Sequence, residues 1–342
     1  MKIANPEDRR TTPQRLWVLL MGMILSVACA TGSSGPSPTH STSLELEISS
    51  DWPALAPGVT TGETSGVGID SHGHVFVFHR GEGPSILGLS AEEGTVIVRF
   101  GEGLFENAHG LAIGPDDAIW VTDTRRHQVL RFSHAGVLEL ALGERGVAGT
   151  DLRHFDQPTD VAVTPEGEIY VSDGYGNNRV VKFAADGTPL LEWGRKGARP
   201  GEFNLPHGIT LDEAGRVYVA DRSNQRVQIF EGDGTFVSAW GEAVFGPGSR
   251  PWGLEFAHER LYVIDGGNMN PLSEDYARIS VLDLEGRVLS QWSQYGEQPG
   301  SLSWGHDLAV GPDGAVYTAE VRHANRAQKF RVPSRRAEPE GP

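Results

Sequence analysis

Three histidines stand at the same position of an internal repeat, and they occur in every second copy. They begin the runs His109-Gly-Leu-Ala-Ile, His207-Gly-Ile-Thr-Leu and His306-Asp-Leu-Ala-Val. The copies between them have no histidine there and carry instead Ser65, Thr159 and Trp252. If each copy is one blade of a closed ring of six, equivalent positions point to one axis and alternate blades lie about 120° apart. Three imidazoles in this arrangement predict a zinc site, and three protein nitrogens with one open position are typical of a catalytic zinc.

The alternative is that these histidines only pack or form hydrogen bonds at the mouth of a channel. Their restriction to alternate copies favours the metal, because a packing role would not require this alternation. A zinc ion there could polarise a substrate oxygen or acidify a bound hydroxyl group.

The repeat predicts an all-β fold. Its copies begin at positions separated by 44 to 54 residues, which is the period of propeller blades rather than of helical solenoids. Each copy has an apolar run, a turn rich in Asp and Gly, and a second β-rich run such as Val217-Tyr-Val-Ala. Further short runs follow, joined by Gly-containing hairpin turns. We therefore expect a six-bladed β-propeller over residues 43–332.

The sixth copy ends after its third strand, near Phe330. Upstream of the first copy, Leu44-Glu-Leu-Glu-Ile-Ser alternates like a strand and has no other obvious partner. We expect this segment to become the outer strand of the last blade and so to close the ring, because an open blade would leave a sheet edge unpaired.

The chain is acidic, with a formal net charge of -16 over 342 residues. Nucleic-acid binding requires a basic surface that neutralises phosphates, so this composition argues against nucleic acid as a partner. The 44 Gly and 21 Pro residues indicate a turn-rich domain.

The amino terminus has the features of an export signal. Basic residues precede an apolar stretch at positions 16–28, which is too short for a typical membrane span. The stretch ends in Leu25-Ser-Val-Ala-Cys29, which is similar to a lipoprotein cleavage box although Ser26 stands where Leu is usual, and Cys29 is the only cysteine. We expect residues 1–29 to form a signal peptide with a lipidated cysteine, and the protein to be an exported lipoprotein that meets the membrane only through this anchor. An ordinary secretory signal cleaved near Ala30 is the alternative.

Flexible segments are expected at both ends of the propeller. Residues 30–42 are rich in Gly, Ser, Pro and Thr and predict a tether. Residues 333–342 are expected to be a disordered tail.

Several motifs go beyond what a generic propeller repeat requires. They are Phe76-Val-Phe-His-Arg80-Gly, Gln157-Pro-Thr-Asp-Val-Ala-Val, Val171-Ser-Asp-Gly-Tyr175, Pro206-His207 and His306-Asp307. Together they resemble peptidyl-α-hydroxyglycine α-amidating lyase, an NHL-repeat six-bladed propeller, over about residues 60–331. The family cleaves the C–N bond of a peptide that ends in α-hydroxyglycine, and the products are a peptide amide and glyoxylate.

The resemblance implies roles for individual residues. The three histidines would be the zinc ligands, and Tyr175 would be the base that deprotonates the substrate hydroxyl. Arg80 and Arg222 would bind the substrate carboxylate and the developing glyoxylate, since the guanidinium fork suits a carboxylate. Asp307 would bind a structural calcium ion with the main-chain carbonyls of Val67 and Leu111, since calcium prefers oxygen ligands.

Two departures from the family lie near this site. Trp304-Gly305 stands where the family has Met-Pro, and Gly176 stands where the family has a cysteine-bearing loop. Neither removes a ligand, so they bear on substrate size and loop rigidity.

The resemblance also implies a partner, because a monooxygenase must first hydroxylate the peptide glycine. A separate enzyme could supply this step, or the propeller could act on another α-hydroxy-amide-like compound. The alternative function is a non-enzymatic NHL propeller that binds a protein or a glycan at the cell envelope.

Overall fold

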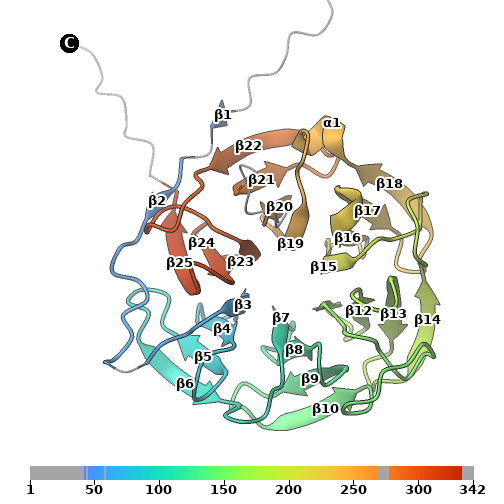
Figure 1. The fold of residues 1–342 in the computed structure, drawn as a ribbon, viewed down its shortest axis with the longest axis horizontal. Coiled ribbons are helices and arrows are strands. Elements are labelled where there is room, and N and C mark those ends of the chain that lie inside the picture. Colours follow the sequence, from blue (N-terminus) through green and yellow to red (C-terminus); the bar gives the residue numbers. More distant parts are fainter. Residues whose placement is uncertain (1–41, 44, 58, 268–276, 333–342) are drawn as a thin grey trace, which may run out of the picture. The chain divides into compact units, whose positions relative to one another are not determined.

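The computed structural model describes residues 42–43, 45–57, 59–267 and 277–332. Six antiparallel sheets stand around one axis (Figure 1), which confirms the predicted six-bladed β-propeller. The strands of each blade follow the chain from the axis outward, and every inner strand contains or adjoins one of the predicted repeat starts.

The first three blades are regular four-stranded sheets. Blade 1 contains β3 (Thr64–Ile69), β4 (Val75–His79), β5 (Ile86–Leu89) and β6 (Val96–Phe100). Blade 2 contains β7 (Ala108–Ile113), β8 (Ile119–Asp123), β9 (Gln128–Phe132) and β10 (Leu138–Leu142). Blade 3 contains β11 (Asp160–Val163), β12 (Ile169–Asp173), β13 (Arg179–Phe183) and β14 (Pro189–Trp193).

The remaining blades continue the pattern, and two of them recruit strands from the start of the chain. Blade 4 contains β15 (Pro206–Leu211), β16 (Val217–Asp221), β17 (Arg226–Phe230) and β18 (Phe236–Trp240). Blade 5 contains β19 (Pro251–Ala257), β20 (Arg260–Asp265), β21 (Arg278–Leu282), β22 (Val288–Ser293) and the short β1 (Thr42–Ser43). Blade 6 contains β23 (Gly305–Val310), β24 (Val316–Glu320), β25 (Arg326–Arg331) and β2 (Glu47–Ile48).

The start of the chain closes the last blade, as the sequence predicts. β2 pairs antiparallel with β25, and Ile48 lies opposite Phe330. Figure 1 shows this blue strand beside the red strands at the end of the chain. The parallel pairing of β1 with β22 was not predicted, and it places Thr42, the last residue of the expected tether, in the sheet of blade 5.

Helices are short in the described part of the chain. They are the 3-10 turn η1 (Arg222–Asn224) and the single-turn α1 (Glu242–Phe245). No helix within the described residues is long and apolar enough to cross a membrane. The expected signal peptide, Cys29 and the tail at 333–342 lie outside the described residues.

The hydrophobic core is divided among the spaces between neighbouring blades. Between blades 1 and 2, for example, Phe76 and Phe78 of β4 pack with Ile119 and Val121 of β8, and all four side chains are fully buried. Because both faces of each blade are covered in this way, the second strand of each blade reads as a continuous apolar run. The packed ring holds the inner strands rigidly around the axis.

Candidate active site at the axis

The three repeat histidines meet at the axis, at the beginning of the inner strands of blades 2, 4 and 6. His109, His207 and His306 are almost fully buried. Their ring centroids lie 4.6 to 4.9 Å apart. One nitrogen from each ring can be chosen so that all three lie within 4.8 Å of one another. The alternation of histidines in the repeat therefore corresponds to a cluster of three imidazoles in the structure.

Each histidine is oriented by a hydrogen bond to the following blade. The Nδ1 atom of His109 lies 2.7 Å from the carbonyl oxygen of Thr159. The corresponding distances are 2.9 Å from His207 to Trp252 and 2.6 Å from His306 to Ser65. The acceptors are the equivalent positions of the three blades that lack histidine. Because a carbonyl can only accept, Nδ1 carries the proton and Nε2 is left with the lone pair that could bind a metal.

The glycine after two of the histidines makes this contact possible. A Cβ atom on Gly110 would lie 2.6 Å from the carbonyl oxygen of Thr159, and one on Gly208 would lie 2.6 Å from that of Trp252. These are the same carbonyls that accept from the histidines. The glycine is therefore required next to the histidine, because the absence of a Cβ atom allows the approach of the carbonyl that orients the imidazole.

Acidic residues at the ends of the second strands hold the loops that lead into the histidine strands. Asp123 accepts the backbone N–H groups of Glu106 and Asn107, at 2.7 and 3.0 Å, just before His109. Asp221 and Glu320 make the matching bonds in the other two histidine blades. This recurrence explains the acidic residues as parts of the repeat.

The electrostatics of the cluster keep the imidazoles neutral. Burial, followed by the positive charge of Arg80, lowers the pKa of His109 to about 3. Burial also lowers the pKa values of His207 and His306 well below the ordinary value, and the neighbouring imidazoles act in the same direction. In addition, Nε2 of His207 is buried and has no hydrogen-bond partner among the described residues. Neutral imidazoles, one of them with an Nε2 that has no partner among the described residues, are the donors that a divalent transition metal requires.

Tyr175 lies beside the cluster on the loop after β12. Its hydroxyl group is 3.0 Å from Nε2 of His109, and its ring packs edge-on against that histidine. Yet 38% of the residue is exposed. Glycine is required on both sides of it, since a Cβ atom on Gly174 would clash with the carbonyl of Pro206 and one on Gly176 with Asp156. The loop therefore presents the phenol to both the histidines and the solvent.

Arg222 covers the other side of Tyr175. Its guanidinium carbon lies 3.5 Å from the ring centroid of Trp252, which in turn contacts His207 at 5.4 Å between centroids. Burial lowers the pKa of Arg222 to about 10, and interaction with Tyr175 opposes this shift. The side chain therefore remains charged near neutral pH while being largely removed from water.

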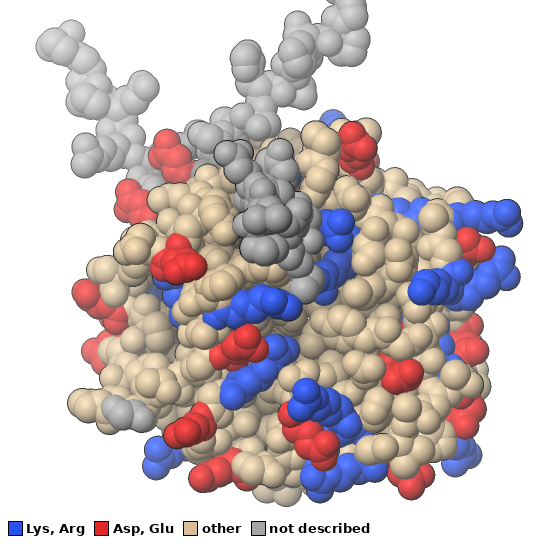
Figure 2. All heavy atoms as spheres, viewed as in Figure 1, with Lys and Arg blue, Asp and Glu red and all other residues tan. Residues whose placement is uncertain are grey.

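Arg80 follows β4 and is fixed from two directions. Its Nε atom donates to the carbonyl of Ala108 at 2.8 Å, and a terminal nitrogen forms an ion pair with Glu63 at 2.7 Å. The positive charges of Arg80 and Arg222 both lower the pKa values of the three histidines. Figure 2 shows Lys and Arg side chains close to the middle of the viewed face, with acidic side chains next to them. The cluster is thus flanked by two cations that a bound anion could contact.

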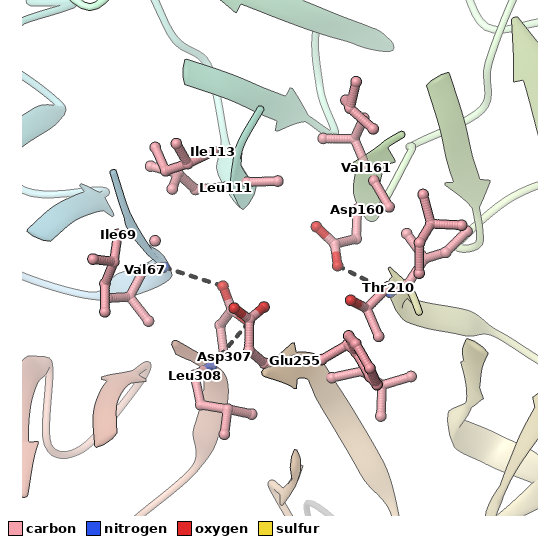
Figure 3. Close-up of a pocket in the computed structure, with 18 residues that line it drawn as sticks. Val67, Ile69, Leu111, Ile113, Asp160, Val161, Thr210, Glu255, Asp307 and Leu308 are labelled. Atoms are coloured by element: carbon pink, nitrogen blue, oxygen red, sulfur yellow. Dashed lines mark hydrogen bonds between the residues drawn. The ribbon is translucent and has the colours of Figure 1, made fainter. Parts of the chain in front are cut away.

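A cavity of about 200 Å³ lies in the channel along the inner strands. It is lined by the predicted calcium ligands Asp307, Val67 and Leu111, and also by Asp160 and Glu255 (Figure 3). Asp307 accepts the backbone N–H of Val67 at 3.1 Å, and Asp160 accepts that of Ile209 at 3.0 Å.

The three carboxyl groups of this cavity are in an unfavourable environment for negative charge. Burial raises the pKa values of Asp160 and Asp307, and the charge of Asp160 adds to the effect on Asp307. Burial, with a contribution from Asp160, raises the pKa of Glu255 to about 8. The ion pairs found among the described residues include none of these three carboxylates. A divalent cation with oxygen ligands would remove this repulsion.

The structure therefore brings the predicted site residues together in two adjoining groups: the histidines with Tyr175, Arg80 and Arg222, and the channel residues around Asp307. Sequence reasoning did not identify Trp252, Glu63 or Glu255 as site residues. For Glu255 a signal was present, since a charged residue interrupts an otherwise apolar inner strand.

Comparison with known proteins supports the propeller fold and its repeats. The NHL repeat family matches residues 105–132, 155–183 and 203–230, which lie in blades 2, 3 and 4. The chain is 33% identical over 305 residues to NHL repeat-containing protein 3 of Homo sapiens, a match that covers 82% of each protein. It is 31% identical over 321 residues to peptidyl-alpha-hydroxyglycine alpha-amidating lyase 1 of Drosophila melanogaster, covering 82% of this chain and 58% of that one. The chain belongs to the NHL-repeat propeller family that includes NHL repeat-containing protein 3, and it is similar to the amidating lyases.

Another relative is a larger protein. The chain is 32% identical over 327 residues to peptidyl-glycine alpha-amidating monooxygenase B of Xenopus laevis, and the match covers 84% of this chain but 36% of that protein. The chain thus spans about a third of the length of this relative. Because family members carry different names, membership alone does not select one reaction.

Solved structures support the same fold. A gluconolactonase of Xanthomonas campestris superimposes with a TM-score of 0.58 at 15% identity, over 80% of this chain and 87% of that one. At this identity the likeness concerns the propeller fold alone.

Proposed function

We propose that the protein is a zinc-dependent lyase that cleaves the C–N bond of a peptidyl- or N-acyl-α-hydroxyglycine. The products are the corresponding amide and glyoxylate. The observation that carries the proposal is the position of the Tyr175 hydroxyl, 3.0 Å from Nε2 of His109. Arg222 interacts with Tyr175, and Arg80 is close enough to His109 to affect its pKa. A proton acceptor and two anion-binding groups therefore lie next to the three buried histidines.

The three Nε2 atoms would hold zinc, since each Nδ1 is committed to a carbonyl and Nε2 of His207 has no other partner among the described residues. When bound, zinc would supply Lewis-acid polarisation of the substrate hydroxyl oxygen. The requirement for the protein is to keep all three imidazoles neutral, and burial achieves this.

Tyr175 is the group placed to take the hydroxyl proton. As that proton leaves, the oxygen becomes the aldehyde oxygen of glyoxylate and the C–N bond breaks. The electron pair goes to the amide nitrogen, which takes up one proton, so the reaction is balanced without a redox cofactor.

The two arginines are placed to bind the carboxylate. Arg222 is buried against Trp252 and Arg80 is fixed by Glu63, so both are held before substrate arrives. A preorganised guanidinium loses little entropy on binding and stabilises charge that develops during cleavage. The carboxylate would therefore fix the position of the hydroxyl relative to Tyr175.

We also propose that the channel cavity binds a structural calcium ion through Asp307 and the main-chain carbonyls of Val67 and Leu111. Asp160 and Glu255 line the same cavity and would add negative charge to this site. The cation would hold inner strands of several blades together.

The substrate and the location extend the proposal. A separate hydroxylating monooxygenase would supply the α-hydroxyglycine. Export as a lipoprotein anchored through Cys29 would place the propeller in the cell envelope, next to peptides outside the cytoplasm.

The test uses the full chain with an N-acyl-α-hydroxyglycine and measures the glyoxylate released. Tyr175→Phe should lower turnover by about two orders of magnitude or more while zinc content is retained, the size expected for the loss of a positioned acid–base group. Tyr295→Phe is the matched control, because this tyrosine is exposed and lies in the segment between β22 and β23. Arg80→Ala should impair both KM and kcat.

A zinc-loaded protein that releases no glyoxylate from several acyl variants would reject the lyase. Such a result would support the alternative of a propeller that only binds a partner at the envelope.

A further inference from the structure

A second histidine cluster lies on the face of the ring opposite the site just described. β3 runs from Ser65, whose carbonyl contacts His306, to Ile69, so the turn after Ile69 lies at the other end of the strand. This turn carries His72 and His74. His134 reaches the same point from the turn between β9 and β10 of blade 2. The cluster therefore spans the boundary between blades 1 and 2.

The three imidazoles converge on one oxygen of a buried carboxylate. Oδ2 of Asp70 lies 2.8 Å from Nδ1 of His74, 2.8 Å from Nε2 of His134 and 4.0 Å from Nδ1 of His72. The side chain of Asp70 is fully buried, whereas those of His72, His74 and His134 are 65%, 33% and 42% exposed. The rings lie 5.8 to 6.1 Å apart between centroids. The carboxylate forms the floor of this cluster and the imidazoles form its open rim.

The floor of the cluster is held independently of the imidazoles. The other oxygen of Asp70 accepts the backbone N–H groups of His72 and His74, at 3.0 and 2.7 Å, so the turn itself fixes the carboxylate. The ring of His134 packs edge-on against Phe76 at 5.4 Å. Asp117 of blade 2 lies 3.3 Å from Nδ1 of His72 and accepts two hydrogen bonds from Ser71. The donors are thus positioned by contacts other than those among themselves.

We propose that Asp70, His72, His74 and His134 form a second site for a divalent transition metal of the zinc class, which joins blades 1 and 2. A tetrahedral zinc about 2.0 to 2.1 Å from its nitrogen and oxygen ligands keeps those ligands roughly 3.3 Å apart. The distances around Asp70 Oδ2 lie on both sides of this value, and one donor atom each from Asp70, His72 and His74 lies within 4.8 Å of the others. Metal binding would draw these donors together with His134, which already lies against the same carboxylate oxygen. Three imidazoles and one carboxylate suit Zn²⁺, Ni²⁺ and Cu²⁺ better than Mg²⁺ or Ca²⁺, which prefer oxygen.

This site differs in kind from the axial one. Its donors include a carboxylate, its imidazoles are partly exposed, and its four ligands would leave no open position for a substrate, which indicates a structural site. The two turns that it joins lie 64 residues apart between Asp70 and His134. Because the bound metal would link two blades, binding should raise the stability of the ring.

The experiment counts zinc bound to the full chain by equilibrium dialysis with elemental analysis. The double variant His74→Ala/His134→Ala should bind about one zinc fewer per chain than the unmodified protein. The matched control is His154→Ala, since His154 is also an imidazole bonded to a carboxylate, that of Asp151, but belongs to no such cluster. This control should bind as much zinc as the unmodified protein.

A second measurement separates the two sites. In the variant His109→Ala/His207→Ala/His306→Ala, zinc should still raise the Tm, and adding His74→Ala/His134→Ala should abolish that rise. If the triple variant does not fold, the difference in zinc content between the double variant and the unmodified protein decides the question. Equal zinc content in the double variant and the unmodified protein would overturn the proposal, whatever the activity of the enzyme.

Discussion

The channel carboxylates make the stability of the metal-free protein depend on pH, and Glu255→Gln tests this directly. Burial and the neighbouring Asp160 raise the pKa of Glu255 from 4.5 to about 8. The folded protein therefore holds a proton on Glu255 at pH values where the unfolded chain has already lost it. Below about pH 4.5, Glu255 is protonated in both states and the protein carries no penalty from it. As the pH rises toward 8, the free energy of unfolding falls, because Glu255 ionises freely in the unfolded chain but not in the folded protein.

The size of this penalty follows from the same pKa difference. Each pKa unit corresponds to about 1.36 kcal/mol, so ionising Glu255 in the folded protein costs on the order of 5 kcal/mol at pH 8 and above. Water in the cavity lowers this figure, which makes it an upper limit. Glutamine has nearly the same shape and does not ionise, so Glu255→Gln should remove this part of the pH dependence and also relieve Asp160.

The assay is urea unfolding at several pH values between 5 and 8 in the presence of EDTA. The free energy of unfolding of the unmodified protein should fall by several kcal/mol over this range, and that of Glu255→Gln should fall clearly less. Glu213→Gln, a change at an exposed turn residue, is the control and should follow the unmodified protein. Saturating calcium should flatten the pH dependence of the unmodified protein. Identical pH profiles for the unmodified protein and Glu255→Gln in EDTA would refute the reasoning.

Three further predictions concern the other parts of the molecule. His207→Ala should abolish activity and lower zinc content by about one per chain, since two nitrogens hold this ion far less well than three, and unchanged zinc would contradict the axial site. Deleting residues 43–50 should lower the free energy of unfolding by about 3 kcal/mol or more, because blade 6 loses its outer strand and the packing of Ile48. An unchanged Tm would show that this strand is not needed to close the ring. Cys29→Ala should move the protein from the detergent-soluble membrane fraction to the soluble fraction, and an unchanged distribution would argue against the lipid anchor.

The fold and the histidine cluster could be predicted because both depend on position within the repeat. In a ring of like blades, one repeat position sets both the depth of a residue along the axis and the direction in which its side chain points. The alternation of His109, His207 and His306 was therefore sufficient to place three imidazoles together. The missing fourth strand of the last copy likewise indicated where Leu44–Ser49 had to pair.

Contacts between blades could not be predicted in this way, because they join residues that no local pattern links. Trp252 was recognised only as a position without histidine, yet its carbonyl orients His207 and its ring supports Arg222. His134 meets Asp70 only after two different turns come together at a blade boundary. Contacts of this kind depend on the angle between neighbouring blades, which the period alone does not specify.

The axial cluster also depends on closure of the ring. The bonds from His109 to Thr159 and from His207 to Trp252 join blades that follow each other along the chain. The bond from His306 to Ser65 instead crosses from the last blade to the first, between residues 241 positions apart in the sequence. This third histidine is therefore oriented only when blade 6 has met blade 1. Loss of ring closure should thus disturb His306 before the other two histidines, so binding of the proposed axial zinc would report on the integrity of the whole ring.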